Sequence, residues 1–216
     1  MSDRARLGEQ SRVFFEEIWR QPDPWALASS AFERERYARL IGVLDDHRYG
    51  RVLEIGCGAG RFTRMLSTLA ERIVALDVSP TAIDRARSGL VPDGVEFRAI
   101  NVLDFDPRAE GPWDLVVMSE TIYYLGWLYS LFDVGWLCSE LLAATKAGGR
   151  LLLANTTGEV GDSLVLPWLI RSYRDLCLNV GYALEHETTF RGTKDDTPID
   201  VLISVLRRPV SSLSVD

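Results

Sequence analysis

The feature that most constrains the fold is the stretch RVLEIGCGAG, residues 51–60. Its apolar run over residues 52–55 predicts a short buried strand, and Gly56, Gly58 and Gly60 then follow at alternate positions. Glycine has no Cβ, so it can adopt positive φ and let a ligand lie against the backbone. Because apolar residues return at helical spacing directly afterwards, the stretch predicts a strand, a tight turn and a helix that together seat a small molecule.

The spacing and charge of this turn indicate the ligand. A dinucleotide site uses G-x-G-x-x-G with the pyrophosphate at the helix N-terminus, whereas this chain has G-x-G-x-G. Glu54 stands two residues before the first glycine, where its carboxylate would repel a pyrophosphate but suits a ligand with cationic groups. S-adenosylmethionine carries such groups and is the cofactor we expect. Cys57 is interpreted as a small residue in the turn, because His47 and His186 are distant in sequence and form no nucleophile–base pattern with it.

Composition limits the remaining possibilities. A chain of 216 residues, 47% hydrophobic and 25% charged, is typical of one soluble α/β domain. The net charge of −7 and the lack of a Lys/Arg cluster disfavour nucleic acid and favour a small or neutral-to-cationic substrate. Cys57, Cys138 and Cys177 form no C-x-x-C pair, so we expect reduced thiols and no metal site. No stretch is apolar enough to span a membrane, and we expect a cytoplasmic protein that is a monomer or weak dimer.

Two helices are expected before the glycine motif. The first covers residues 11–21 and ends at the prolines that follow, after which a short segment is extended. Ser30 and Glu33 have the spacing of a capping box that opens a second helix over residues 31–45. The two helices are too short to form a domain, so we expect them to cap the C-terminal edge of the sheet.

Within this cap, Trp25 with Arg36 or Tyr37 is the best candidate for closing over the cofactor. An aromatic ring can stack on the ligand, and a guanidinium can pair with its carboxylate. The alternative is that Trp25 and Tyr37 only pack the cap.

Polar residues also end the next two strands. Asp77 follows a predicted strand over residues 73–76, and a carboxylate at this place can accept hydrogen bonds from both hydroxyls of a ribose. Asn101 follows a predicted strand over residues 95–100. Its Oδ1 could accept from an adenine amino group while the N–H of Val102 donates to a ring nitrogen, or Asn101 could simply form the turn.

The rest of the chain continues the alternation of strands and helices. Residues 113–118 form a fourth strand that runs into SETIYYL, which should face the same crevice as the glycine turn and carry the chemistry. The further expected elements are a helix over 125–146 ending in Gly148 and Gly149, a strand over 150–155, a loop loosened by Gly158 and Gly161 that could act as a lid, a helix over 164–180, a hairpin of 182–190 with 199–206, and a frayed tail over 207–216.

These elements predict an α/β, Rossmann-like fold with a mostly parallel seven-stranded sheet and one antiparallel strand. We expect a single domain over 1–216, divided into a helical cap (1–48), the core (49–206) and the tail.

The runs VLEIGCGAGRFT, ALDVSPTAIDRAR, FRAINVLDF, WDLVVMSETIYYL and AGGRLLLANT resemble the class I S-adenosylmethionine-dependent methyltransferases along most of the chain. DPWALASSAFERERY, EIGCGAGRFT and above all SETIYYL are similar more closely to the nodulation N-methyltransferases of the NodS family. The resemblance implies methylation of the free amine on the non-reducing glucosamine of a deacetylated chitooligosaccharide, an intermediate of Nod factor biosynthesis, with S-adenosyl-L-homocysteine as the second product. Asn101 departs from the aspartate of many class I enzymes.

Motifs and resemblance together predict the site. The cofactor-binding residues are Trp25, Arg36, Glu54, Gly56, Cys57, Gly58, Gly60, Asp77, Val78, Asn101, Val102 and Ser119. The catalytic residues are Glu120 and Tyr124, and the substrate-binding residues are Tyr37, Glu120, Tyr123, Tyr124, Trp127 and Asn155. Glu120 would hold the acceptor ammonium and take up its proton; alternatively it only pairs with a cap residue while the tyrosines belong to the core.

Three other functions remain open at this point. The first is a small-molecule N- or O-methyltransferase with a different acceptor, and the second is a non-catalytic protein that binds S-adenosylmethionine. An NAD-dependent enzyme is disfavoured by the glycine spacing.

Overall fold

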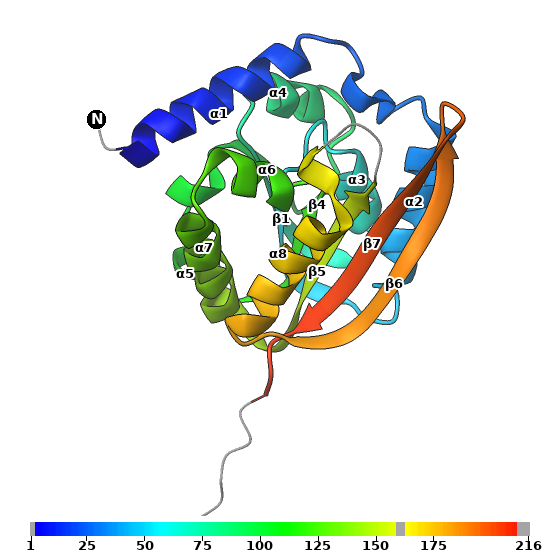
Figure 1. The fold of residues 1–216 in the computed structure, drawn as a ribbon. Helices are drawn as coiled ribbons and strands as arrows, with labels where there is room; N and C mark the ends of the chain where they lie inside the picture. Colours follow the sequence, from blue (N-terminus) through cyan, green and yellow to red (C-terminus); the bar gives the residue numbers. More distant parts are fainter. Residues whose placement is uncertain (1–2, 159–162, 211–216) are drawn as a thin grey trace, which may run out of the picture.

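A twisted seven-stranded sheet forms the centre of the computed structural model, which describes residues 3–158 and 163–210. The strands are β1 (Tyr49–Ile55), β2 (Ala70–Asp77), β3 (Val95–Ala99), β4 (Trp113–Ser119), β5 (Thr145–Thr157), β6 (Ala183–Lys194) and β7 (Thr197–Arg207). Their order is β3-β2-β1-β4-β5-β7-β6, and β7 runs antiparallel to both of its neighbours (Figure 1). This arrangement confirms the predicted fold class.

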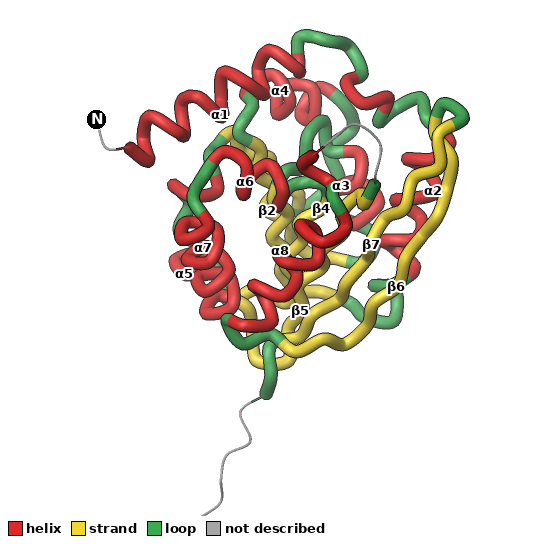
Figure 2. Tube along the Cα trace, in the orientation of Figure 1, coloured by secondary structure: helices red, strands yellow, loops and turns green. Residues whose placement is uncertain are grey.

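Helices cover both faces of the sheet (Figure 2). They are α1 (Asp3–Trp19), α2 (Ala31–Gly42), α3 (Arg61–Leu66), α4 (Pro80–Ser88), α5 (Pro107–Glu110), α6 (Ile122–Leu128), α7 (Leu131–Ala144) and α8 (Pro167–Asn179), with the 3-10 turns η1 (Pro24–Ala26), η2 (Val102–Asp104) and η3 (Ser163–Val165). One apolar core joins the sheet to α6, α7 and α8, and a second joins it to α2, α3 and α4. Alternate side chains of each strand enter opposite cores, as the pleat requires.

The N-terminal cap has a different shape from the one we expected. Helix α1 begins at Asp3 and not near residue 11, and Arg4 of its polar first turn lies over the Trp136 ring, with 4.4 Å between guanidinium carbon and ring centroid. The segment after α1 is the turn η1 and not an extended stretch. Helix α2 packs against α3 and β6 on one face of the sheet, so only part of it reaches the sheet's C-terminal edge.

The capping box predicted at the start of α2 is wrong. Ser30 is the N-cap residue but its side chain makes no capping hydrogen bond. Glu33 is buried and accepts hydrogen bonds from Arg36 and Lys194 instead. An ion pair between buried partners prevails here over a local bond at the helix end.

The helix predicted over residues 125–146 is also wrong, because it is two helices. Ser130 and Asp133 form a real capping box that starts α7 after α6 has ended at Leu128. The chain is already extended at Thr145, so Gly148 and Gly149 belong to β5 and do not end a helix. The expected lid residue Gly161 and residues 211–216 of the tail lie outside the described part of the chain.

The β6–β7 hairpin is long and reaches back to the cap. Asp195 and Asp196 form its two-residue turn with φ values of 49° and 61°, as a tight hairpin requires. Figure 1 shows this turn beside the N-terminal segment, and Lys194 donates a hydrogen bond to the carbonyl of Trp25. The C-terminal hairpin and the N-terminal cap therefore meet at the same end of the molecule.

Candidate active site

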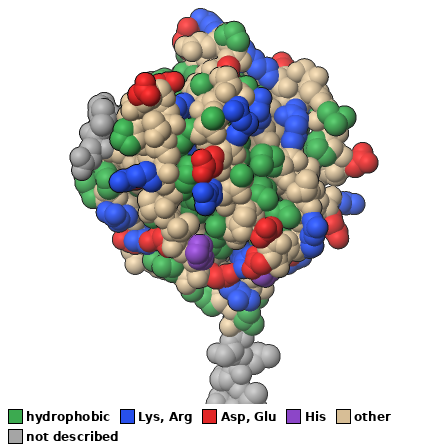
Figure 3. Space-filling model, turned by 90° about the vertical axis from the view of Figure 1, so that its right-hand side faces the viewer, with side chains coloured by type: hydrophobic (Ala, Val, Ile, Leu, Met, Phe, Trp, Pro, Cys, Tyr) green, Lys and Arg blue, Asp and Glu red, His purple; other side chains and the backbone are tan. Residues whose placement is uncertain are grey.

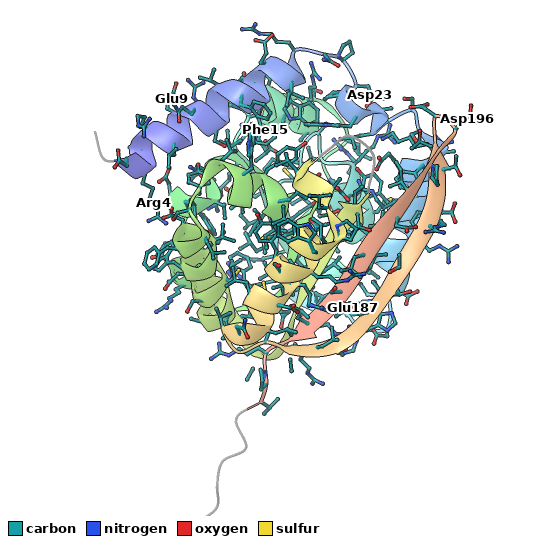
Figure 4. The ribbon with its side chains drawn as sticks, viewed as in Figure 1. Arg4, Glu9, Phe15, Asp23, Glu187 and Asp196 are labelled. Carbon is teal, nitrogen blue, oxygen red and sulfur yellow. The ribbon has the colours of Figure 1, made fainter. Side chains whose placement is uncertain are left out.

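A cavity of about 590 Å³ lies at the carboxyl ends of the parallel strands. Its wall comes from α1, η1, α2, the ends of β1, β2, β4 and β5, helix α6, and the β6–β7 hairpin. In Figure 4, Phe15 points from α1 toward α6, while Asp23 and Asp196 mark the cap and the hairpin turn at the other side. A parallel sheet is expected to bind its ligand at this edge.

The glycine turn forms the floor of the cavity as the sequence predicts. The φ values of Gly56, Gly58 and Gly60 are 79°, 53° and 73°, in the left-handed region that favours glycine. A Cβ on Gly58 would lie 2.9 Å from the Trp19 ring, and one on Gly56 would collide with the Thr121 hydroxyl. Gly56 and Gly58 line the cavity, whereas Gly60 faces Phe97 outside it.

Two buried carboxylates stand on either side of this turn. Burial, helped by the charge of Asp77 and opposed by Thr63, raises the pKa of Glu54 to about 7. Burial likewise raises the pKa of Asp77 to about 6, although its carboxylate accepts hydrogen bonds from the N–H groups of Ser79 and Gly58, both at 2.9 Å. Glu54 Oε2 is buried and has no partner within hydrogen-bond geometry among the residues that the structure describes, although the Thr63 hydroxyl lies near enough to lower the pKa of the carboxyl. A cationic ligand group would supply the missing partner.

The neighbouring residues of the turn and of β2 also reach the cavity. Cys57 and Val78 are part of its wall, and burial raises the pKa of the Cys57 thiol, which agrees with its interpretation as a small residue and not a nucleophile.

Asn101 and Val102 line the cavity beyond the end of β3. Asn101 Oδ1 accepts from the N–H of Leu103 at 3.1 Å, and its amide nitrogen donates to the Tyr129 hydroxyl at 2.7 Å. These bonds show Asn101 forming the turn, which was the second of the two interpretations. Its contact with adenine stays a prediction. In that contact Asn101 Oδ1 would accept from the adenine amino group and from the N–H of Leu103 together.

A chain of four charges crosses the other half of the cavity. Arg36 donates to Glu33 Oε2 and Glu120 Oε1, with N–O distances of 2.7 Å and 3.1 Å, and to the Ser119 hydroxyl at 3.1 Å. Lys194 donates to Glu33 Oε1 at 2.7 Å. Burial acts to lower the pKa of Arg36, but the charge of Glu120, with those of Tyr37 and Glu33, raises it above its ordinary value. Arg36 is therefore a permanent cation with carboxylate partners.

Glu120 follows the end of β4 in the left-handed region, with φ 54°. Its Oε1 accepts from Arg36 and from both the N–H and the hydroxyl of Thr156, at 2.8 Å and 3.1 Å, and its Oε2 accepts from the Tyr123 hydroxyl at 2.9 Å. The side chain is still 22% exposed. Glu120 thus pairs with the cap residue Arg36, as the second interpretation expected, and it also borders the cavity, so its role toward the acceptor stays a prediction.

Aromatic rings form the wall between α1, η1 and α6. The centroid of Trp25 lies 6.0 Å from that of Trp19 and 6.5 Å from that of Tyr124, and Phe15 lies 5.1 Å from Tyr124. Tyr37 stacks on Phe62, and burial raises its pKa to about 12. Trp25, Tyr37, Tyr123 and Tyr124 all line the cavity.

The predicted residues Trp127 and Asn155 are not brought to this cavity. Trp127 is half exposed and packs on Phe14 of α1, with centroids 5.0 Å apart. Asn155 is buried in β5, and the next residue, Thr156, reaches the cavity in its place.

Three residues that line the cavity, Glu33, Thr156 and Lys194, were not predicted from the sequence. Glu33 was assigned to a cap, and its spacing of three residues from Arg36 was the one available signal for a helical ion pair. Thr156 and Lys194 carry no local signal, because their partners are 36 and 161 residues away.

Metal-binding clusters and membrane-spanning helices are both absent from the part of the chain that the structure describes. Among residues 3–158 and 163–210, no group of three or more His, Cys, Asp or Glu side chains could hold a metal ion. In the same part of the chain, no helix combines the length and apolarity that crossing a membrane demands. On the side of the molecule where β6 and α2 lie, basic and acidic side chains are intermingled (Figure 3).

The strand order, the glycine turn and the acidic residue at the end of β2 are those of the Rossmann-like fold of class I S-adenosylmethionine-dependent methyltransferases. Residues 10–133 match the model of the family described as Nodulation protein S (NodS), and the chain belongs to this family. This confirms the predicted resemblance.

The relatives give the same result. Nodulation protein S of Rhizobium tropici is 33% identical over 135 residues, which are 62% of this chain and 55% of the relative; that of Bradyrhizobium diazoefficiens is 38% identical over 105 residues, 48% and 49% of the two chains. The chain therefore spans about half the length of these curated relatives. The crystal structure of the N-methyltransferase NodS from Bradyrhizobium japonicum WM9 with S-adenosyl-L-homocysteine superposes with a TM-score of 0.77 at 25% identity, covering 92% of this chain and 98% of that one.

Proposed function

We propose that this chain binds S-adenosylmethionine in the cavity and transfers its methyl group to the free amine on the non-reducing glucosamine of a deacetylated chitooligosaccharide, a step of Nod factor biosynthesis. The observation that carries the cofactor assignment is the buried, unpartnered Glu54 Oε2 beside a glycine turn in which a Cβ would collide with its neighbours. Membership of the NodS family supports the reaction and the acceptor class.

The residues present fit the cofactor at each of its parts. Glu54 would hold the ammonium of the methionine moiety and Arg36 its carboxylate, since both residues line the cavity, are buried and carry opposite charges. Asp77 would accept from the ribose hydroxyls, and Val102 and Asn101 would border the adenine. When bound, S-adenosylmethionine supplies an electrophilic methyl group on a sulfonium.

The acceptor would enter the half of the cavity bordered by Glu120, Tyr124 and the hairpin. An amine attacks in line with the bond that breaks, so positioning and exclusion of water supply most of the rate. Glu120 is held by Arg36, Thr156 and Tyr123, and we assign it the orientation of the acceptor amine, whose proton leaves to Glu120 or to water.

The test is mass spectrometry of deacetylated chitooligosaccharides incubated with the protein and S-adenosylmethionine. We expect the mass of one or more methyl groups on the terminal glucosamine, and no product from a fully N-acetylated oligosaccharide, which lacks the free amine. Binding of S-adenosylmethionine without product from these oligosaccharides or from a panel of small amines and alcohols would favour a non-catalytic binding protein. Product from another acceptor in the panel would keep the methyltransferase and replace the substrate.

A further inference from the structure

Lys194 is the residue through which the C-terminal hairpin enters the site. It ends β6 beside the hairpin turn, outside residues 10–133 that the family model matches. Its side chain lines the cavity and is 18% exposed. Its ammonium donates to Glu33 Oε1 at 2.7 Å and to the Trp25 carbonyl at 2.5 Å, so one cation joins the hairpin to two elements of the cap.

The charges around Lys194 are balanced in pairs. Glu33 uses one oxygen for Lys194 and the other for Arg36, and Arg36 also faces Glu120. With Lys194 present, two carboxylates face two cations. Without it, both carboxylates would depend on the single guanidinium of Arg36, and this buried cluster would carry a net negative charge that disfavours any incoming anion.

We propose that Lys194 is a positioning residue for the carboxylate of S-adenosylmethionine, acting through Glu33 on Arg36. Because Lys194 neutralises part of the charge of Glu33, the potential at the Arg36 guanidinium stays positive enough to attract the carboxylate of the ligand. The inference rests on the proposed function, in which Arg36 receives that carboxylate.

The second hydrogen bond of Lys194, to the Trp25 carbonyl, stabilises a turn that forms part of the cavity wall. Trp25 and Ala26 have φ values of 56° and 53°, which cost free energy in residues with a Cβ and persist only where neighbouring bonds impose them. On one side, the carboxylate of Asp23 accepts from the N–H groups of Ala28 and Ser29, at 2.8 Å and 3.1 Å. On the other side, Lys194 binds the carbonyl of Trp25. The same cation thus fixes both the charge next to Arg36 and the turn that carries Trp25.

The experiment compares Lys194→Met with Arg191→Met by calorimetric titration. Arg191 is a matched control because it lies on the same strand near the same turn, is exposed, and pairs with Asp200 without lining the cavity. Two ligands are used: S-adenosyl-L-homocysteine, and its decarboxylated analogue, S-adenosyl-3-thiopropylamine, which keeps the ammonium but lacks the carboxylate.

We expect Lys194→Met to weaken S-adenosyl-L-homocysteine binding about tenfold or more and the decarboxylated analogue by less than about threefold, since only the first ligand needs the potential of Arg36. Lys194→Arg should restore most of the lost affinity, and Arg191→Met should change neither ligand. Circular dichroism and the unfolding temperature establish that each variant is folded.

Two results would overturn the inference. Equal losses for both ligands would mean that Lys194 only holds the cap together, and an unchanged affinity for S-adenosyl-L-homocysteine would mean that Arg36 does not need it. The proposed cofactor site fails separately, because in that case the wild-type protein binds neither ligand, and failure of the proposed acceptor appears only in the methylation assay.

Discussion

The strongest test of the site concerns Glu54, whose burial should make both stability and cofactor binding depend on pH. In the folded protein the pKa of this carboxyl is raised from 4.5 to about 7. The folded state therefore binds the proton more tightly than the unfolded state. Between pH 4.5 and about pH 7 the folded state holds more protons than the unfolded state, so the free energy of unfolding falls as the pH rises through this range. The destabilisation by ionised Glu54 is complete above about pH 7.

The size of the effect follows from the shift. A rise from 4.5 to about 7 corresponds to about 3 kcal/mol of unfolding free energy at pH 8. Glu54→Gln removes the ionisable group and keeps the shape, so we expect it to stabilise the protein by up to about 3 kcal/mol at pH 8 and by progressively less as the pH falls to 5.5. Urea denaturation of both proteins across this range measures the difference.

Cofactor binding should change in the opposite direction. If the ammonium of the ligand pairs with ionised Glu54, binding has to expel a proton below pH 7. The wild-type affinity for S-adenosyl-L-homocysteine should then fall about twentyfold from pH 8 to pH 6, about tenfold from Glu54 and about twofold from Asp77. Glu54→Gln should bind the ligand more than tenfold more weakly at pH 8. It should keep only the smaller pH dependence of Asp77, about twofold at pH 6 from its pKa of about 6.

The two measurements together can refute the reasoning. A Glu54→Gln variant that is no more stable than wild type at pH 8 would show that ionised Glu54 does not destabilise the folded protein. A variant that gains stability but binds the ligand as tightly as wild type would remove Glu54 from the cofactor site.

The other predictions concern three residues of the same cavity. Asp77→Ala removes a carboxylate that would accept two ribose hydroxyls, so calorimetry should show at least about tenfold weaker cofactor binding, and an unchanged affinity would remove Asp77 from the site. Gly58→Val should abolish binding, since the branched side chain opposes a φ of 53° and would meet the ring of Trp19; retained affinity would contradict the role of the turn. Glu120→Gln should reduce turnover by about a hundredfold or more while the folded variant still binds cofactor, and turnover should recover in part at higher pH, where the acceptor amine is neutral. If the variant turns over as fast as wild type at pH 7, Glu120 has no part in the mechanism and other residues position the acceptor.

The part of the site that was predicted most fully from the sequence is the part around the glycine turn, whose residues are close together in the chain. The glycine turn, Glu54 and Asp77 lie within 24 positions, and the ends of two adjacent parallel strands bring them together without any distant contact. The mostly parallel sheet was predicted from the same regularity, because alternating strands and helices are typical of parallel pairing. In this part of the chain, residues that are close in sequence are also close in space, so a local pattern suffices to predict the site.

The failures of prediction have the opposite cause. The spacing of Ser30 and Glu33 satisfies the capping-box pattern, yet Glu33 turns inward because a buried cation from the far end of the chain is available to it. The apolar run after SETIYYL has helical periodicity throughout, and only the local bonds of Ser130 with Asp133 divide it into two helices. In the first case a distant partner prevails over a local pattern, and in the second a local cap interrupts a longer periodicity.

This division of the cavity bears on how its specificity arises. Asp77 and the glycine turn belong to the stretch that the family model covers, whereas Thr156, Lys194 and the hairpin residues Thr197 to Ile199 lie beyond it. The residues proposed for cofactor binding thus form one compact motif inside the matched stretch, while the opposite wall also draws on segments outside it. Exchanging the hairpin tip should therefore alter which acceptor is methylated before it alters cofactor affinity, except at Lys194, where the two walls share one charge cluster.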